Sequence, residues 1–193
     1  HGAKVQLKGV STHGIAWFPQ YVNKEAFRTL RDRYGINTIR LAMYATKGEG
    51  YGPAARKKVY EGVKYASELG MYVIIDFHIL ADGNPRHYMK KAAKFFGKAA
   101  KKYAKKSNVI YEICNEPNSG TSWEQIREYA GQVIPVIRKY SPEALILVGT
   151  PEYSFDITKV CGEKLEDEQV MYTFHYYAGQ SNEQYEQMME TCH

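Results

Sequence analysis

The sequence has few cysteines, and their spacing disfavours two classes of small stabilised domain. Only three occur among the 193 residues, at Cys114, Cys161 and Cys192, with no CxxC pair. An odd number at these spacings argues against a disulfide scaffold and against a structural zinc site. Cys114 alternates with apolar residues, so we expect it to be a small buried hydrophobic side chain.

Long apolar runs and a visible signal peptide are also missing. No run approaches the roughly 20 apolar residues that a membrane-spanning helix needs. The chain opens with His1-Gly2-Ala3-Lys4 and leads directly into a strand-like segment, as a processed secreted protein also would. A hydrophobic fraction of 44% and a length of 193 residues suit one globular domain. We therefore expect a single domain over residues 1–193, with no membrane partner.

One segment lacks acidic residues altogether. Residues 90–106 carry eight lysines, which account for the net charge of +5. On a helix, the apolar residues of this segment fall on one side: Ala92, Phe95, Phe96, Ala99 and Tyr103. We interpret the lysines as the solvated face of an amphipathic helix. Nucleic-acid binding is disfavoured, because the aromatic residues that would stack on bases are needed for the core.

Strand-like and helix-like segments alternate along the chain. The predicted strands are Leu7–Thr12, Thr38–Tyr44, Tyr72–Ile79, Val109–Asn115, Leu145–Thr150 and Val170–Tyr177. The predicted helices are Lys24–Tyr34, Pro53–Leu69, Arg86–Lys106, Ser122–Tyr140 and Asn182–Thr191, with a poorly patterned segment at Asp156–Leu165. Nearly continuous apolar strands such as "YVIID" and "LILVG" are typical of parallel sheets covered on both faces. The pattern leaves an open doubly wound sheet or a (β/α) barrel.

The first strand-to-helix connection favours the barrel. It reads "STHGIAWFPQYVNKE", which is long and aromatic and lacks the GxGxxG loop of a nucleotide-binding fold. In a (β/α) barrel the active site lies at the C-terminal ends of the strands. Every predicted strand end supplies polar or aromatic residues: Ser11, Thr12 and His13; Arg40 and Tyr44; Asp76 and His78; Asn115 and Glu116; Glu152 and Tyr153; His175 and Tyr177.

This set of side chains suits a sugar. The HExxH zinc motif and the GxSxG serine elbow are both absent, and we expect neither a metal nor a cofactor. Aromatic rings stack on pyranose faces, amides and imidazoles bond hydroxyl groups, and a carboxylic acid can protonate a glycosidic oxygen.

Six blocks in sequence order resemble the family 5 glycoside hydrolases, and most of all their bacterial endo-β-1,4-glucanases. They are "LKGVSTHGIAWFPQYVNKE", "INTIRLAMY", "YVIIDFHIL", "VIYEICNEPN", "VIPVIRKYSPEALILVGTP" and "VMYTFHYYAG". The resemblance implies a (β/α)8 TIM-type barrel, incomplete here with about six βα units. It also implies hydrolysis of internal β-1,4-glucosidic bonds in cellulose or β-glucan with retention of configuration. Mannan and xylan are the alternative substrates.

The resemblance also implies residue roles. Glu116, in Asn-Glu-Pro, would be the general acid/base, and Asn115 would bond the sugar 2-hydroxyl. Arg40, His78, His175 and Tyr177 would line the −1 subsite, and His13 and Trp17 would serve the glycone side. Tyr153 occupies a position that is usually tryptophan in the family. Structural interpretations stay open: Arg40 could neutralise inward acids, His78 and His175 could be core histidines, Trp17 could pack within its loop, and Asp76 could be a supporting hydrogen-bond partner.

The family's nucleophile, a glutamate that ends the seventh strand, has no counterpart here. Strands seven and eight are both missing from the resemblance, which stops after six βα units. Glu112 would lie about 13 Å from Glu116 along an extended strand, too far for a retaining pair. Glu152 follows a neighbouring strand and is the candidate substitute nucleophile.

Incomplete closure leaves several outcomes open. The six strands could form a smaller barrel, two chains could pair as a homodimer through the open barrel edge, or the chain could be one piece of a longer protein. The alternative function is a non-catalytic β-glucan-binding partial barrel, active only when another chain or segment completes it. In either case we expect a β-glucan polysaccharide or oligosaccharide as the partner, no nucleic acid, and a secreted, extracellular location.

Overall fold

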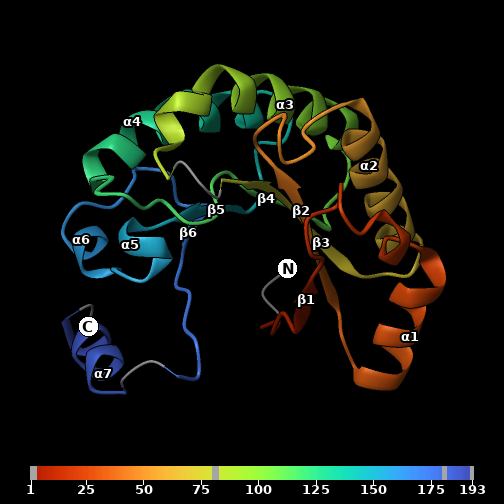
Figure 1. The fold of residues 1–193 in the computed structure, drawn as a ribbon, viewed down its shortest axis with the longest axis horizontal. Coiled ribbons are helices and arrows are strands. Elements are labelled where there is room, and N and C mark those ends of the chain that lie inside the picture. Colours follow the sequence, from red (N-terminus) through yellow and green to blue (C-terminus); the bar gives the residue numbers. More distant parts are fainter. Residues whose placement is uncertain (1–3, 80–82, 180–181, 192–193) are drawn as a thin grey trace. The chain divides into compact units, whose positions relative to one another are not determined.

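A computed structural model of the chain describes residues 4–79, 83–179 and 182–191. Strands and helices alternate along the sequence (Figure 1), and the six strands form one sheet in the order β1-β2-β3-β4-β5-β6. Strand β1 pairs with β2, β4 with β5 and β5 with β6, and each of these pairings is parallel. The chain divides into two compact units, residues 1–76 with 106–110 and residues 77–105 with 111–193.

The first unit contains the N-terminal βα repeats. Its elements are β1 (Gly9–Ser11), η1 (Pro19–Tyr21), α1 (Lys24–Tyr34), β2 (Thr38–Tyr44), α2 (Pro53–Glu68) and most of β3 (Tyr72–His78). Helix α1 begins where the Asn23 side chain accepts a hydrogen bond from the Ala26 backbone N–H. It ends at Gly35, which has a left-handed φ of 66°. The buried core residues of this unit include Phe27, Leu41 and Val63.

The second unit contains the C-terminal repeats. Its elements are η2 (Pro85–Tyr88), α3 (Met89–Tyr103), the second half of β4 (Val109–Glu112), α4 (Trp123–Arg138), β5 (Ile146–Gly149), α5 (Pro151–Ser154), α6 (Thr158–Cys161), β6 (Val170–Thr173) and α7 (Asn182–Thr191). Phe77, Phe95, Phe96 and Tyr111 form a continuous cluster of buried rings. Helix α4 begins with the predicted capping box, in which Ser122 and Gln125 bond each other's backbone N–H.

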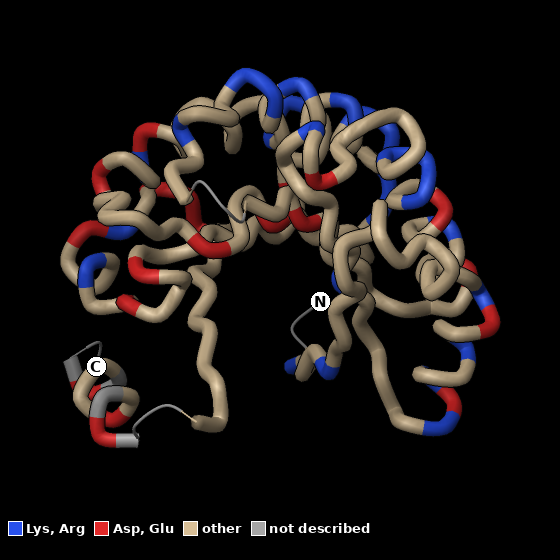
Figure 2. The backbone as a smooth tube through the Cα atoms, viewed as in Figure 1, with Lys and Arg blue, Asp and Glu red and all other residues tan. Residues whose placement is uncertain are grey.

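Helix α3 has the predicted division of faces. Its buried residues include all five that the sequence placed on one side: Ala92, Phe95, Phe96, Ala99 and Tyr103. Basic residues run along the helix (Figure 2). In the described part of the chain, no helix is long and apolar enough to cross a membrane.

The predicted elements are confirmed, but several boundaries were wrong. Strand β4 ends at Glu112 rather than Asn115, and β6 ends at Thr173 rather than Tyr177. After β6 the chain leaves the sheet because the His175 backbone N–H bonds the Ser154 carbonyl at 2.7 Å. The predicted helix from Arg86 to Lys106 divides into η2 and α3, and the short α5 was not predicted.

The cysteines need one correction. Cys114 is buried and free, as predicted. Cys161, in contrast, is disulfide-bonded; the cysteine spacing argued only against a disulfide scaffold, and this single bond was not predicted. Cys192 lies outside the described residues. Cysteine spacing alone could not reveal this bond, because pairing depends on the tertiary approach of segments far apart in sequence.

Arg138, at the end of α4, holds the loop that leads into β6. Its Nε and Nη2 donate to the two Asp167 carboxylate oxygens at 2.7 and 2.9 Å. Its Nη1 donates to the Ala144 carbonyl at 2.6 Å. The hydrogen bonds from Arg138 lower the pKa of Asp167 below its ordinary value. The hydrogen bonds from Arg138 to Asp167 and Ala144, here called the Arg138 clamp, therefore stabilise the fold when Asp167 is ionised.

We expect Asp167→Asn to lower the free energy of unfolding at pH 7 by about 1–2 kcal/mol, because the charged hydrogen bonds weaken. A carboxyl whose pKa is depressed by folding stabilises the protein above its unfolded pKa, and this contribution is lost as the pH falls through the folded pKa. The difference from wild type should therefore narrow between pH 5 and pH 2, a range of about 3 units around the ordinary Asp pKa. Urea unfolding of both proteins across this pH range measures the difference in their unfolding free energies.

The exposed ion pair of Arg31 with Asp32 provides the control for the clamp. Asp32→Asn should change the unfolding free energy little at any pH, because solvent screens such pairs. A pH-independent loss in Asp167→Asn would contradict the electrostatic explanation.

Candidate active site

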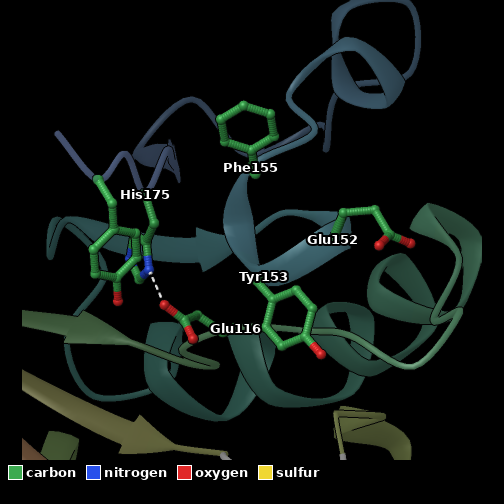
Figure 3. A pocket seen from close by; sticks show the side chains of 6 residues that line it. Glu116, Glu152, Tyr153, Phe155 and His175 are labelled. Carbon is green, nitrogen blue, oxygen red and sulfur yellow. Dashed lines mark hydrogen bonds and ion pairs between the residues drawn. The ribbon is translucent and has the colours of Figure 1, made fainter. Parts of the chain in front are cut away.

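Glu116 lies just beyond the end of β4 and faces a histidine from the end of β6. Its Oε1 is 2.7 Å from Nδ1 of His175 (Figure 3). The side chains are mostly buried, with 18% of Glu116 and 25% of His175 exposed. The parallel sheet explains the meeting, because the C-terminal ends of its strands share one edge. A carboxyl group and an imidazole at this distance can pass a proton between them. The contact also restricts the orientation of both side chains.

A pocket of about 410 Å³ opens beside this pair. Its lining residues come from the segments that follow β4, β5 and β6: Glu116, Glu152, Tyr153, Phe155, His175 and Tyr177. Two of the rings are well exposed, Tyr153 at 55% and Tyr177 at 67%. The pocket thus combines a titratable pair with accessible aromatic faces. Phe155 was not predicted, since no periodicity in the sequence marks a loop phenylalanine as a lining residue.

The turn after β5 has an unusual backbone. Glu152, Tyr153 and Ser154 all have left-handed φ angles, of 53°, 62° and 59°. A left-handed conformation costs a residue with a side chain roughly 1–2 kcal/mol, so contacts elsewhere must hold this turn. One is the hydrogen bond from the Tyr153 N–H to the Pro117 carbonyl at 2.9 Å. The turn is therefore fastened to the segment that carries Glu116.

Gly149 allows β5 to approach that same segment closely. A Cβ at this position would lie 2.7 Å from the Cys114 carbonyl oxygen and 2.8 Å from both the Asn115 carbonyl oxygen and Cδ of Pro117. Two of these three atoms belong to the backbone and cannot move aside easily. The absence of a side chain at Gly149 thus helps to set the position of Glu116.

Glu152 lines the pocket, but its carboxylate points away from Glu116 in Figure 3. The role of Glu152 as a substitute nucleophile stays a prediction, and in this conformation the side chain would have to rotate to face Glu116.

Asn115 and His78 also meet. The Asn115 side chain is 2% exposed, and its Nδ2 lies 3.2 Å from Nε2 of His78 and 3.4 Å from the Ile79 carbonyl oxygen. His78 ends β3. The amide therefore sits against the imidazole, and each restricts the orientation of the other.

The remaining predicted residues belong to the first unit. Nη2 of Arg40 lies 2.9 Å from Oδ2 of Asp76, whose side chain is fully buried. The Trp17 ring is 47% exposed and lies 5.4 Å from the ring of His13 and 4.9 Å from that of Tyr44. Arg40 thus has a structural partner, and Trp17 presents part of its ring to solvent. Asp76 matches the supporting hydrogen-bond partner that the sequence suggested.

Among the described residues, no cluster of three or more His, Cys, Asp or Glu side chains could hold a metal ion. The side chains of the site offer proton transfer, hydrogen bonding and ring stacking. These are the contacts that a neutral, hydroxyl-rich ligand uses.

The family description "Cellulase (glycosyl hydrolase family 5)" matches residues 1–192. Endoglucanase A of Butyrivibrio fibrisolvens is 47% identical over 185 residues, covering 92% of this chain and 43% of the relative. Endoglucanase 5 of Pectobacterium carotovorum subsp. carotovorum is 48% identical over 181 residues, covering 92% of this chain and 36% of the relative. The chain thus spans less than half the length of these curated relatives.

Solved structures agree with the sequence comparison. The catalytic domain of Thermobifida fusca endoglucanase Cel5A superposes with a TM-score of 0.92 at 35% identity, covering all of this chain and 66% of that one. A cellulase named Cel5C_n has a TM-score of 0.91 at 34% identity, covering 97% of this chain and 61% of that one. These likenesses confirm the predicted fold class, an incomplete (β/α) barrel of the TIM type. The chain belongs to the cellulase family, glycosyl hydrolase family 5.

Proposed function

We propose that the chain carries the acid/base half of an endo-β-1,4-glucanase site, which cleaves internal β-1,4-glucosidic bonds in cellulose or β-glucan. The observation that carries this proposal is the Glu116 carboxylate, held 2.7 Å from His175 at the edge of an aromatic-lined pocket. The names of the relatives, endoglucanases from several bacteria, support the same reaction.

In this proposal Glu116 acts twice. It first donates its proton to the glycosidic oxygen as the bond from that oxygen to the anomeric carbon breaks, while a second carboxylate attacks that carbon. It then takes a proton from a water molecule, whose oxygen displaces the second carboxylate and releases the sugar with retained configuration. His175 orients the Glu116 carboxyl group and keeps it aimed into the pocket.

The other predicted residues bind the sugar. Tyr153 and Tyr177 provide exposed rings at the pocket, and Trp17 provides one in the first unit. Aromatic faces of this kind pack against the apolar faces of glucose. Asn115, His78, Arg40 and His13 are proposed to bond hydroxyl groups of the substrate. A T. fusca Cel5A variant has been solved with cellotetraose, which supports a cello-oligosaccharide over mannan or xylan.

The second carboxylate of a retaining pair is the open part of the site. Such a group lies about 5–5.5 Å from the acid/base. We propose that it comes from a strand that follows β6 in the family fold, on a longer form of this polypeptide or on another chain. Glu152 is the alternative within the described residues. The solved catalytic domain, of which this chain spans 66%, contains further structure that could supply the group.

The second candidate function is a non-catalytic β-glucan-binding partial barrel that becomes active when another chain or segment completes it. The exposed edge of β6, where Met171 is 56% exposed, favours this candidate. Pairing of two copies through this edge is one way to cover it. Light scattering at increasing protein concentration tests this pairing, since a stable monomer would count against it.

Hydrolysis and binding should be measured on the same purified chain. We expect binding of cellotetraose by calorimetry, and new reducing ends from carboxymethylcellulose where Glu152 or a second copy of the chain supplies the second carboxylate. Binding without reducing ends would overturn hydrolysis by this polypeptide and support the binding module. Absence of both would overturn both candidates. Mannan and xylan, assayed in parallel, decide the substrate class.

We also propose that the protein is secreted. A polymer such as cellulose has to be cleaved outside the cell that uses it. The disulfide at Cys161 supports this location, because such bonds persist in oxidising compartments.

A further inference from the structure

We propose that Ser154 is a positioning residue that fixes Glu116 and His175 relative to each other. The inference rests on the proposed acid/base role of Glu116. Ser154 follows β5, touches neither substrate nor proton in the proposed reaction, and is completely buried. It nevertheless contacts the chain on both sides of the pair, from β4 and from β6.

The first contact reaches the segment of Glu116. The Ser154 hydroxyl donates a hydrogen bond to the carbonyl oxygen of Asn115 at 2.7 Å, one residue before Glu116. The neighbouring Tyr153 N–H donates to the carbonyl oxygen of Pro117 at 2.9 Å, one residue after it. The turn thus grips the backbone on either side of Glu116, at the place where Gly149 permits close approach.

The second contact reaches the segment of His175. The carbonyl oxygen of Ser154 accepts a hydrogen bond from the His175 backbone N–H at 2.7 Å. The Thr173 hydroxyl donates to the Ser154 hydroxyl oxygen at 3.2 Å. One buried serine therefore links the two backbone segments whose side chains meet 2.7 Å apart.

The backbone of Ser154 shows that this position is constrained. Its φ of 59° lies in the left-handed region, directly after two other left-handed residues. A run of this kind persists only where surrounding contacts hold it, and such sites cluster at functional positions. Glycine could adopt the same φ without strain but would supply no hydroxyl group. This difference separates the role of the hydroxyl from that of the backbone.

The test uses the proton of the His175 ring as its readout. A ring N–H held against a carboxylate gives a downfield proton resonance that exchanges slowly with water, and Glu116→Gln identifies it. In Ser154→Ala and Ser154→Gly we expect this proton to exchange about tenfold faster or more, because a small displacement of the pair breaks its alignment. Circular dichroism establishes that each variant is folded.

Ser141→Ala is the matched control. Ser141 is also a buried serine of the second unit, and its hydroxyl donates to the Ala100 carbonyl at 3.3 Å. This variant should lose stability without changing the His175 resonance. A folded Ser154→Gly with wild-type exchange would overturn the proposal, as would a wild-type protein with no protected ring proton. Unfolding of both Ser154 variants would assign the residue a purely structural role and also overturn it.

The outcome is independent of the glucan assays. If the His175 proton depends on Ser154 while the chain neither binds nor cleaves glucan, the positioning stands and the proposed function fails. If glucan is cleaved and the proton is unchanged in the Ser154 variants, the proposed function stands and the positioning fails.

Discussion

In a form of the protein that has both carboxylates, replacing Glu116 by glutamine is expected to reduce the hydrolysis of carboxymethylcellulose by about 10²–10⁴-fold, the usual contribution of a general acid/base. Glutamine has nearly the same shape, so it keeps the pocket filled, but its amide cannot deliver a proton to the glycosidic oxygen. Cellotetraose binding should change little, because the aromatic rings of the pocket remain. Initial rates of reducing-end release and calorimetric binding measure the two effects separately.

Glu152→Gln is the matched control, because Glu152 lines the same pocket and is the other carboxylate there. If Glu152 takes no part in the reaction, Glu152→Gln keeps wild-type activity, and the prediction that Glu152 is a substitute nucleophile fails. If both variants are inactive, Glu152 has a role in the reaction. Unchanged hydrolysis in Glu116→Gln would remove Glu116 from the acid/base role altogether.

Removing the Asp76 carboxylate is expected to cause the largest loss of stability. Asp76 is completely buried and lies 2.9 Å from Arg40, whose side chain is only 18% exposed. Asp76→Ala would leave the guanidinium charge in a mostly dry environment without this partner, which typically costs about 3–5 kcal/mol. Urea unfolding followed by circular dichroism measures the free energy. Tryptophan fluorescence adds signals from Trp17 in the same unit and from Trp123 in the other.

The double variant Arg40→Met with Asp76→Leu separates charge from packing. Both charges are then gone, and exchange of a buried ion pair for apolar groups of similar size is often close to neutral. We therefore expect the double variant to recover much of the stability lost in Asp76→Ala. A loss below about 1 kcal/mol in the single variant would mean that other groups satisfy Arg40.

The order of elements could be predicted because local signals agree with the tertiary structure. Helix α1 was predicted to the residue, since Gly35 marks its end and the apolar pattern marks its body. Strand β2 was also predicted to the residue, because it is buried along nearly its whole length. The ends of β4 and β6 were wrong because hydrogen bonds with a distant turn decide where those strands leave the sheet. The Ser154 hydroxyl donates to the Asn115 carbonyl, and the His175 N–H donates to the Ser154 carbonyl.

The site could be predicted only in part. Sequence places Glu116 and His175 at strand ends, and parallel strands bring such ends to one edge. It cannot indicate that their side chains meet at 2.7 Å, since that depends on the turn after β5. Ser154 carries no local signal, because its left-handed backbone is imposed by partners on two other segments. The disulfide at Cys161 was missed for the same kind of reason.

The contact between Glu116 and His175 also has a consequence during biosynthesis. The two residues are 59 positions apart in the sequence. At roughly 5–20 residues per second, the ribosome needs about 3–12 seconds to make the chain between them. A nascent chain that already contains β4 and Glu116 therefore still lacks both the turn that grips the acid and the imidazole that faces it. The proposed acid can acquire its working surroundings only after β6 has been translated, so partly synthesised chains should be catalytically silent.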